Sequence, residues 1–144
     1  DLRQAPAQYP LAWCHGAPGV ALGRLPLLDL DPQARTEVAE AITRTLAAPP
    51  LLGHGLCHGQ LGNLVIADEA ARRLGRADLA AQVQHKGRAV LQVLHRSGPR
   101  GSLAFAAAAP GLMDGLAGVG LGLLRLAYPD KVPLVQALAA GPPG

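Results

Sequence analysis

Two kinds of apolar segment alternate along the chain, and their spacing predicts a set of helices. At 32–47 aliphatic side chains recur every four residues, which is typical of an amphipathic helix with one buried face. The pair Asp31-Pro32 is a typical helix start, because aspartate caps the first turn and proline fits the first helical position. Pro49-Pro50 ends this helix. The predicted buried face consists of Val38, Ile42 and Leu46.

A longer amphipathic helix is predicted at 78–95, with Asp78 as its cap. Gly87 lies inside this segment and lowers its helix propensity slightly. The predicted apolar stripe consists of Leu79, Val83, Val90, Leu91 and Leu94. Before it, 60–74 is apolar at most positions and predicts another helix, which Gly75 ends as a left-handed C-terminal cap.

A Gly-x-x-Gly signature opens each of three apolar stretches. The copies begin at Gly16, Gly59 and Gly115, roughly 43 and 56 positions apart, which is typical of helical-hairpin repeats. The stretches that follow are 20–28, 64–74 and 119–127. This alternation predicts a two-layer array, with glycine-started helices inside and amphipathic helices facing water. We expect the first-turn N–H groups of the inner helices to point inward unpaired, toward an anion or thiolate.

The third copy lies in the most apolar part of the chain, 101–124. Pro110, Asp114 and several glycines argue against a membrane-spanning helix there. We expect a shorter helix that reaches about residue 128 and ends at Pro129. A short element is expected at 133–138, followed by a frayed terminus at 141–144.

The composition favours one all-α domain with neither nucleic acid nor membrane as a partner. The 144 residues are 49% hydrophobic, mainly Ala and Leu, and only 3% aromatic, a balance that favours helices over strands. The net charge of +3 comes mainly from scattered arginines, without the basic run interleaved with aromatics of a nucleic-acid surface. Residues 1–10 lack the order of a signal peptide, and free thiols suit a reducing cytoplasm, where we expect the protein.

The candidate chemistry lies in two matching motifs, Trp13-Cys14-His15-Gly16 and Leu56-Cys57-His58-Gly59, which contain both cysteines of the chain. Thiolate and imidazole are the ligands that zinc prefers. Cys14, Cys57 and His58 are the predicted ligands, with a fourth position open, because three protein ligands and one exchangeable position are typical of catalytic zinc. The leading hypothesis is a zinc site that handles a sulfur substrate, whose pKa the metal lowers.

Two other interpretations of these residues stay open. In one, both cysteines are small buried core residues. In the other, Cys14, His15, Cys57 and His58 form a closed structural zinc site, although their spacing matches no finger or ribbon. His15 is also a candidate catalytic residue, as a proton donor or acceptor near the metal, and a hydrogen-bonded structural histidine is its alternative.

Other polar residues near the motifs have simpler expected roles. His54 is expected to face solvent or to orient a ligand, and His85 and His95 are expected to lie on the surface of the amphipathic helix. Asp114 takes the frame position of the two motif histidines, in a copy with Met113 in place of cysteine. A helix cap is favoured for Asp114 over a hydrogen-bond acceptor for a metal ligand. No dinucleotide fingerprint, phosphate-binding loop or serine nucleophile motif is present.

Together these motifs resemble the LanC-like cyclases that make lanthipeptides. The motifs that carry the resemblance, in the family's order, are 13–19, then Cys57-His58-Gly59 with Gly62-Asn63-Leu64, and 112–120 leading into 123–126. In having histidine directly after the first cysteine, the chain resembles the cyclase part of class II (LanM-type) synthetases. The resemblance implies an α/α toroid, of which 1–144 is a C-terminal portion with about three helical hairpins.

The resemblance also implies chemistry and partners. It implies Zn²⁺ at Cys14, Cys57 and His58, and addition of peptide cysteine thiolates to dehydroalanine or dehydrobutyrine to form thioether rings. The partners are a dehydrated precursor peptide and the remainder of the synthetase, which holds a catalytic histidine and aspartate. We therefore expect little or no cyclisation by this segment alone, and apolar surface on its open faces. The alternatives are a zinc-stabilised helical scaffold without catalysis, which has four protein ligands, and a glutathione-handling LanC-like protein.

Overall fold

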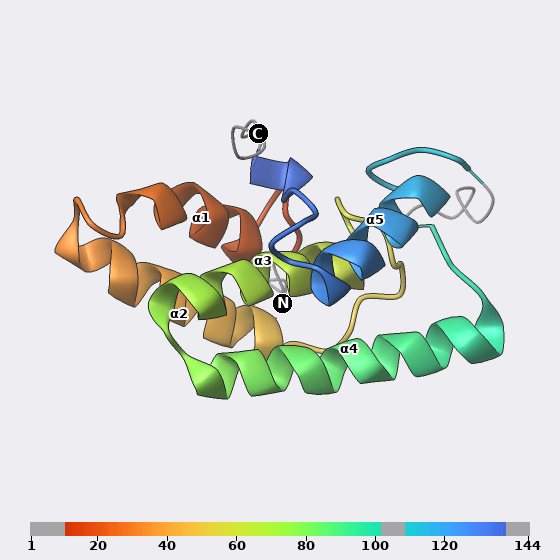
Figure 1. Cartoon of the computed structure of the whole chain (residues 1–144), viewed down its shortest axis with the longest axis horizontal. Coiled ribbons are helices and arrows are strands. Elements are labelled where there is room, and N and C mark those ends of the chain that lie inside the picture. Colours follow the sequence, from red (N-terminus) through yellow and green to blue (C-terminus); the bar gives the residue numbers. More distant parts are fainter. Residues whose placement is uncertain (1–10, 102–108, 138–144) are drawn as a thin grey trace, which may run out of the picture.

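Five α-helices and two short 3₁₀ helices build residues 11–101 and 109–137, the part of the chain that the computed structural model describes (Figure 1). In chain order they are α1 (Ala17–Arg24), η1 (Leu25–Leu27), α2 (Pro32–Ala47), α3 (Gln60–Leu74), α4 (Ala77–Ser97), α5 (Leu116–Ala127) and η2 (Val135–Ala137). Within these ranges the one β-type pairing is an isolated bridge between Ala12 and His15. The predicted all-α class is confirmed. The predicted terminus at 141–144 lies outside the described residues.

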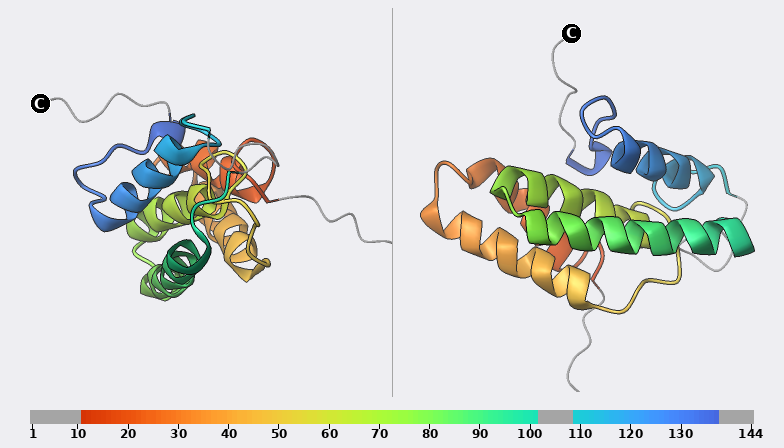
Figure 2. Two further views of the ribbon diagram at one scale, coloured as in Figure 1. Left: turned by 90° about the vertical axis from the view of Figure 1, so that its right-hand side faces the viewer. Right: turned by 60° about the horizontal axis from the view of Figure 1, so that its bottom comes forward.

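The helices form two layers, with α1, α3 and α5 in one and α2 and α4 in the other. The glycine-started helices are neighbours, with α3 in contact with both α1 and α5 (Figure 1). Each amphipathic helix packs against the glycine-started helix that precedes it, α2 on α1 and α4 on α3. Figure 2 shows from the end how α2 and α4 lie together on one side of α3. For α1 to α4 this is the predicted alternation of glycine-started and amphipathic helices, as expected for a segment of an α/α toroid.

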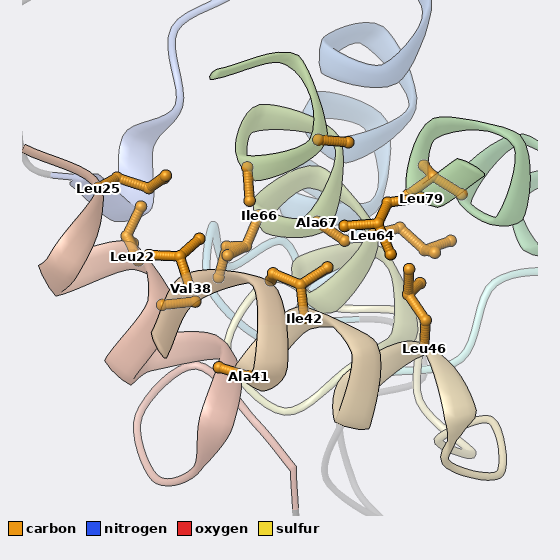
Figure 3. Packing of buried hydrophobic residues seen from close by; sticks show 14 of the residues in the cluster. Leu22, Leu25, Val38, Ala41, Ile42, Leu46, Leu64, Ile66, Ala67 and Leu79 are labelled. Carbon is orange, nitrogen blue, oxygen red and sulfur yellow. The ribbon is translucent and has the colours of Figure 1, made fainter. Parts of the chain in front are cut away.

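The amphipathic helix α2 buries the face that its sequence predicts. The Asp31 side chain caps the helix by accepting a hydrogen bond of 2.9 Å from the backbone N–H of Gln33. Burial of each aliphatic side chain contributes roughly 1.5–3 kcal/mol, so this face dominates the stability of the first hairpin. Figure 3 shows the face packed against side chains of α1 and α3. The buried residues that meet there include Val38, Ile42, Leu46, Leu22, Leu64 and Ile66.

The central helix α3 is buried on all sides over its first two turns. Every residue at 60–67 is buried, because α1, α2, α4 and α5 all contact this helix. Gly75 ends it with a left-handed conformation, φ 68°, that costs a glycine little. The next N–H, from Arg76, donates to the carbonyl of Ala71 at 2.9 Å, which completes the C-terminal cap. Both predicted ends of this helix are confirmed.

The outer helix α4 has its cap two residues earlier than predicted. Arg76 occupies the cap position, and Asp78 lies inside the first turn, where its carboxylate accepts two hydrogen bonds of 2.7 Å from the Arg76 guanidinium. The prediction of Asp78 as the cap is wrong, although a negative charge in the first turn still favours the helix. The predicted stripe is buried at Leu79, Val83 and Val90, whereas Leu91 is exposed.

The second glycine of each Gly-x-x-Gly signature allows its helix to touch a loop carbonyl. The added Cβ and the carbonyl oxygen would lie 2.1 Å apart for Gly19 and Trp13, 1.9 Å for Gly62 and Leu56, and 1.9 Å for Gly118 and Leu112. No side chain fits such a gap, because nonbonded carbon and oxygen need more than 3 Å. In every copy the carbonyl belongs to the residue just before the cysteine or its Met113 counterpart. The same glycine–carbonyl contact, here called the packing rule, therefore positions all three loops on their helices.

Loop carbonyls also occupy first-turn amides of α3 and α5. In each helix two N–H groups donate to the carbonyl seven residues earlier. These bonds run from Gln60 to Gly53 (2.8 Å), Gly62 to Gly55 (3.2 Å), Leu116 to Ala109 (2.8 Å) and Gly118 to Gly111 (3.4 Å). The expectation that these amides stay unpaired and face an anion is therefore wrong, because the folded-back loop already satisfies them.

His54 is buried, at 4% relative exposure, and this corrects its expected place at the solvent side. Its Nδ1 accepts a hydrogen bond of 3.0 Å from the backbone N–H of Arg100, and the backbone N–H of His54 donates to the Arg100 carbonyl at 2.9 Å. Burial, together with the positive charge of Arg100, lowers the pKa of His54 below its ordinary value. His54 therefore ties the loop before α3 to the end of α4 as a neutral imidazole.

The last helix, α5, exposes an apolar face. Gly118, Val119 and Gly122 are buried, whereas Leu116 and Leu124, which are two turns apart, are exposed. This agrees with the expected apolar surface on an open face. No helix in the described ranges has both the length and the apolar character needed to cross a bilayer.

Two glycines of α5 give a matched test of the carbonyl packing. Gly118→Ala should lower the free energy of unfolding by about 1–3 kcal/mol, because the new methyl collides with the Leu112 carbonyl. Gly120→Ala should raise it by about 0.5–1 kcal/mol, because no atom lies within 4 Å of the added Cβ and alanine favours helix. Chemical denaturation measures both, and similar effects of the two variants would contradict the packing rule.

The buried His54 predicts a loss of stability in mild acid. Its folded-state pKa lies below the ordinary value of 6.5, so the unfolded chain binds the extra proton first as pH falls. Stability is fully present above pH 6.5 and should decline below it, by at most about 1.4 kcal/mol per pH unit. His54→Asn, whose amide oxygen can accept from the Arg100 N–H, should flatten this slope. Unfolding measured from pH 5 to 8 compares the parent with His54→Asn, and parallel curves of stability against pH would argue against this role of His54.

Candidate metal centre

Three predicted ligand residues lie together where the three loops meet the inner helices. One donor atom each from Cys14, Cys57 and His58 lies within 4.8 Å of the other two. His58 turns its Nε2 toward the Cys14 sulfur, at 3.0 Å. Cys14 belongs to the first loop, residues 11–16 before α1. Cys57 and His58 belong to the second loop, residues 48–59 before α3. The third loop, residues 109–115, precedes α5. The sequence therefore brings together residues that are 43 or more positions apart, as the hypothesis of a shared metal requires.

Backbone pairing and one buried amide hold the first loop. Ala12 and His15 exchange two backbone hydrogen bonds of 3.2 Å, so Trp13 and Cys14 form the tip of a tight turn. The Asn63 side chain, on the first turn of α3, donates to the Leu11 carbonyl at 2.7 Å. Asn63 is buried, where an unpaired side-chain N–H is costly, so this bond fixes the first loop against the second repeat.

The second and third loops share a carbonyl. The backbone N–H groups of Leu56 and Cys57 both donate to the Met113 carbonyl, at 2.7 and 2.9 Å. On the other side, the buried Gln136 side chain of η2 donates to the Leu56 carbonyl at 3.1 Å. Cys57 is thus held from both sides by main-chain groups. Asn63, Met113 and Gln136 were not predicted to support the site, and for the last two the sequence carries no local signal.

The two sulfurs differ in environment. Cys57 is buried, whereas Cys14 is exposed. Burial first, then a hydrogen bond with Cys14, raises the pKa of the Cys57 thiol to about 12. Such a thiol keeps its proton at neutral pH unless a cation lies beside it. The two cysteines thus place one sulfur in a buried loop and the other at the surface.

His15 lies beside the three donors and outside their group. Its Nδ1 is 2.9 Å from the Cys14 sulfur, and its ring centre is 5.4 Å from that of His58. The side chain is exposed. The structure thus places both motif histidines against one sulfur, but only His58 is also within reach of Cys57.

Asp114 lies next to His58 and does not cap α5. Gly115 occupies the cap position, and no side chain caps this helix. The Asp114 Oδ1 atom instead lies 3.5 Å from His58 Nδ1. The favoured expectation of a cap is wrong, and the alternative, an acceptor for a metal ligand, agrees with this position. His85 and His95 are exposed on α4, as predicted.

The donor set fits a tetrahedral zinc ion. Zinc binds sulfur at about 2.3 Å and nitrogen at about 2.0 Å, so its ligand atoms lie roughly 3.5–4 Å from one another. The observed donors lie within 4.8 Å, and two soft sulfurs with one imidazole are the ligands that zinc prefers. Cys14 and His15 leave one side of the set at the surface, where a fourth ligand can enter.

The larger cavities lie to the sides of this set. One cavity, about 880 Å³, runs between α1 and the segment after α5, from Trp13 to Arg72 and Arg125. A second, about 390 Å³, lies between α4 and the loop before α3. None of the three donors lines either cavity. The exposed Cys14 sulfur is therefore reached from the surface and not through either cavity.

Comparison with known families agrees with the geometry. The sequence model of the family described as lanthionine synthetase C-like protein matches residues 1–138. No curated protein and no solved structure gives a significant match. The resemblance to LanC-like proteins that the motifs indicate is confirmed at the level of the family. Because the match covers nearly the whole sequence, the chain belongs to the lanthionine synthetase C-like family.

Proposed function

We propose that this chain forms the thiol-activating zinc site of a lanthipeptide cyclase. The observation that carries the proposal is that three donors, Cys14, Cys57 and His58, lie within mutual reach, with His15 outside the group. Three protein ligands and an accessible fourth position are typical of catalytic zinc, whereas a closed set of four is typical of structural zinc. Membership of the lanthionine synthetase C-like family supports the same chemistry.

The proposed reaction joins a peptide cysteine to a dehydroalanine or dehydrobutyrine of the same precursor peptide. The cysteine sulfur forms a bond to the β-carbon of the alkene, and the alkene electrons move to the α-carbon and its carbonyl. A proton is then added at the α-carbon, which completes the thioether. Bound Zn²⁺ supplies the positive charge that ionises the substrate thiol near neutral pH. The two thiolates of the chain offset much of that charge, so the substrate sulfur remains nucleophilic.

The chain's own residues divide the remaining work. Cys57 and His58 anchor the site in the buried loop, and the exposed Cys14 completes it at the surface. His15, beside the Cys14 sulfur, is placed to hold the proton that the substrate thiol loses or to return one. An exposed imidazole exchanges protons with water rapidly, which suits this role.

The proposal includes the place of the chain in a larger enzyme. Residues 1–144 form the C-terminal portion of a cyclase domain of the class II type, for which the histidine after Cys14 is the indication. The exposed leucines of α5 supply an apolar face suited to contact with the remainder of the synthetase. The precursor peptide reaches the donors from the side of Cys14.

Metal analysis with zinc X-ray absorption tests the proposal. The purified chain should bind one Zn²⁺ with two sulfur ligands, one imidazole and one light, exchangeable ligand. Addition of a cysteine-containing peptide should replace the light ligand and raise the sulfur count to three, because the open position accepts a thiolate. A peptide with serine in place of cysteine is the matched control for the ligand.

Variants separate this function from a scaffold. Cys57→Ala and His58→Ala should each lose most zinc affinity, since either removes one of three ligands. His95→Ala, which changes an exposed histidine of α4, should leave affinity unchanged. A parent site with two sulfurs and two imidazoles, unaltered by the cysteine peptide, would show a structural zinc and rule out the proposed role.

A further inference from the structure

Asp114 and His58 face each other through buried atoms that have no other partner. Asp114 Oδ1 and His58 Nδ1 lie 3.5 Å apart. Neither atom makes a hydrogen bond within the described residues, and both are closed off from solvent. Two buried polar atoms without partners are costly unless they serve each other.

Backbone contacts on both sides of Asp114 fix the turn from which its carboxylate projects. The preceding residue, Met113, is fixed by two N–H groups of the second loop. The following residue, Gly115, donates its N–H to the Gly111 carbonyl at 3.0 Å, and a Cβ there would meet the Ala109 oxygen at 2.3 Å. The turn is therefore fixed on both sides of Asp114, and it presents the carboxylate to the second loop.

No competing partner accounts for the position of Asp114. Among the described residues its one ion-pair contact is with His58, whereas Glu69 and Asp78 pair with arginines. It does not cap α5. It also occupies the same place in the repeat as His15 and His58, so each of the three loops directs its equivalent side chain to one spot.

We propose that Asp114 is a positioning residue that orients His58 for the metal. This inference rests on the proposed zinc site. With Nε2 directed at the donor set, the ring proton lies on Nδ1, and the Asp114 carboxylate accepts it. The hydrogen bond fixes both the tautomer and the rotation of the ring, so Nε2 is held toward the sulfurs before the metal arrives. The carboxylate also makes Nε2 a stronger donor.

The third repeat thus contributes to the site without supplying a ligand. Its cysteine position is Met113, whose carbonyl holds the second loop, and its histidine position is Asp114, whose side chain orients the ligand of that loop. Loss of such an acceptor typically weakens metal binding by about 10–100-fold, which is large enough to measure and smaller than the loss of a ligand.

Zinc affinity, measured by competition with a chromophoric chelator, tests the inference without a cyclisation assay. Asp114→Ala should weaken binding by about 10–100-fold. Asp114→Asn should recover part of the loss, because an amide oxygen can still accept from Nδ1. Asp29→Ala is the matched control, since this exposed aspartate has no side-chain partner among the described residues, and it should bind zinc as the parent does. Visible spectra of the cobalt-substituted proteins should show an altered ligand field for Asp114→Ala only.

The outcomes separate this inference from the function on which it rests. Equal affinities and spectra for the parent and Asp114→Ala, with binding still lost in Cys57→Ala, overturn the positioning role alone. If zinc affinity depends on Asp114 but the zinc does not bind the thiol of a cysteine peptide, positioning is supported and the cyclase proposal is overturned. A parent that binds no zinc overturns both. If Asp114→Ala also lowers the unfolding midpoint of the metal-free protein, the near-isosteric Asp114→Asn is compared with it. Zinc affinity between that of Asp114→Ala and that of the parent supports positioning, and affinity as low as that of Asp114→Ala overturns it.

Discussion

The contact on which the rest of the structure depends is that between a helix backbone and the carbonyl of the loop that precedes it. Gly19, Gly62 and Gly118 each bring a helix so close to such an oxygen that no side chain fits between them. Since the oxygen belongs to the residue just before Cys14, Cys57 or Met113, the contact places each loop tip at a fixed height above its helix. The precision of the donor set follows from backbone packing and not from the donors themselves, in keeping with sites built on rigid elements.

The site belongs to the array of repeats and not to any one loop. Asn63 joins the second repeat to the first loop, the Met113 carbonyl joins the third loop to the second, and Gln136 holds the second loop from the C-terminal side. The donors come from two of these loops, and the third supports them. Misplacement of any one repeat therefore moves ligands that belong to another, so the fold of the array and the chemistry of the site are coupled.

Much of the fold could be predicted because its signals are local. Asp31, Pro32 and Gly75 mark helix ends through their own backbone preferences, and the pairing of Cys57 with His58 is a local motif. The failures are non-local. His54 is buried because Arg100, 46 residues later, supplies its partner. Asp114 faces His58 because the loop before α5, far along the chain, folds back onto the loop before α3. The first-turn amides were expected to be free because the fold-back of seven residues that satisfies them leaves no compositional mark.

The shared carbonyl of Met113 shows how a repeat can support the site without holding a ligand of its own. One carbonyl oxygen has two lone pairs, and here two amides of the neighbouring loop use both. Any residue has this carbonyl, so the anchoring does not depend on which side chain stands at the position. Cysteine could therefore be exchanged for methionine in the third repeat without loosening its neighbour.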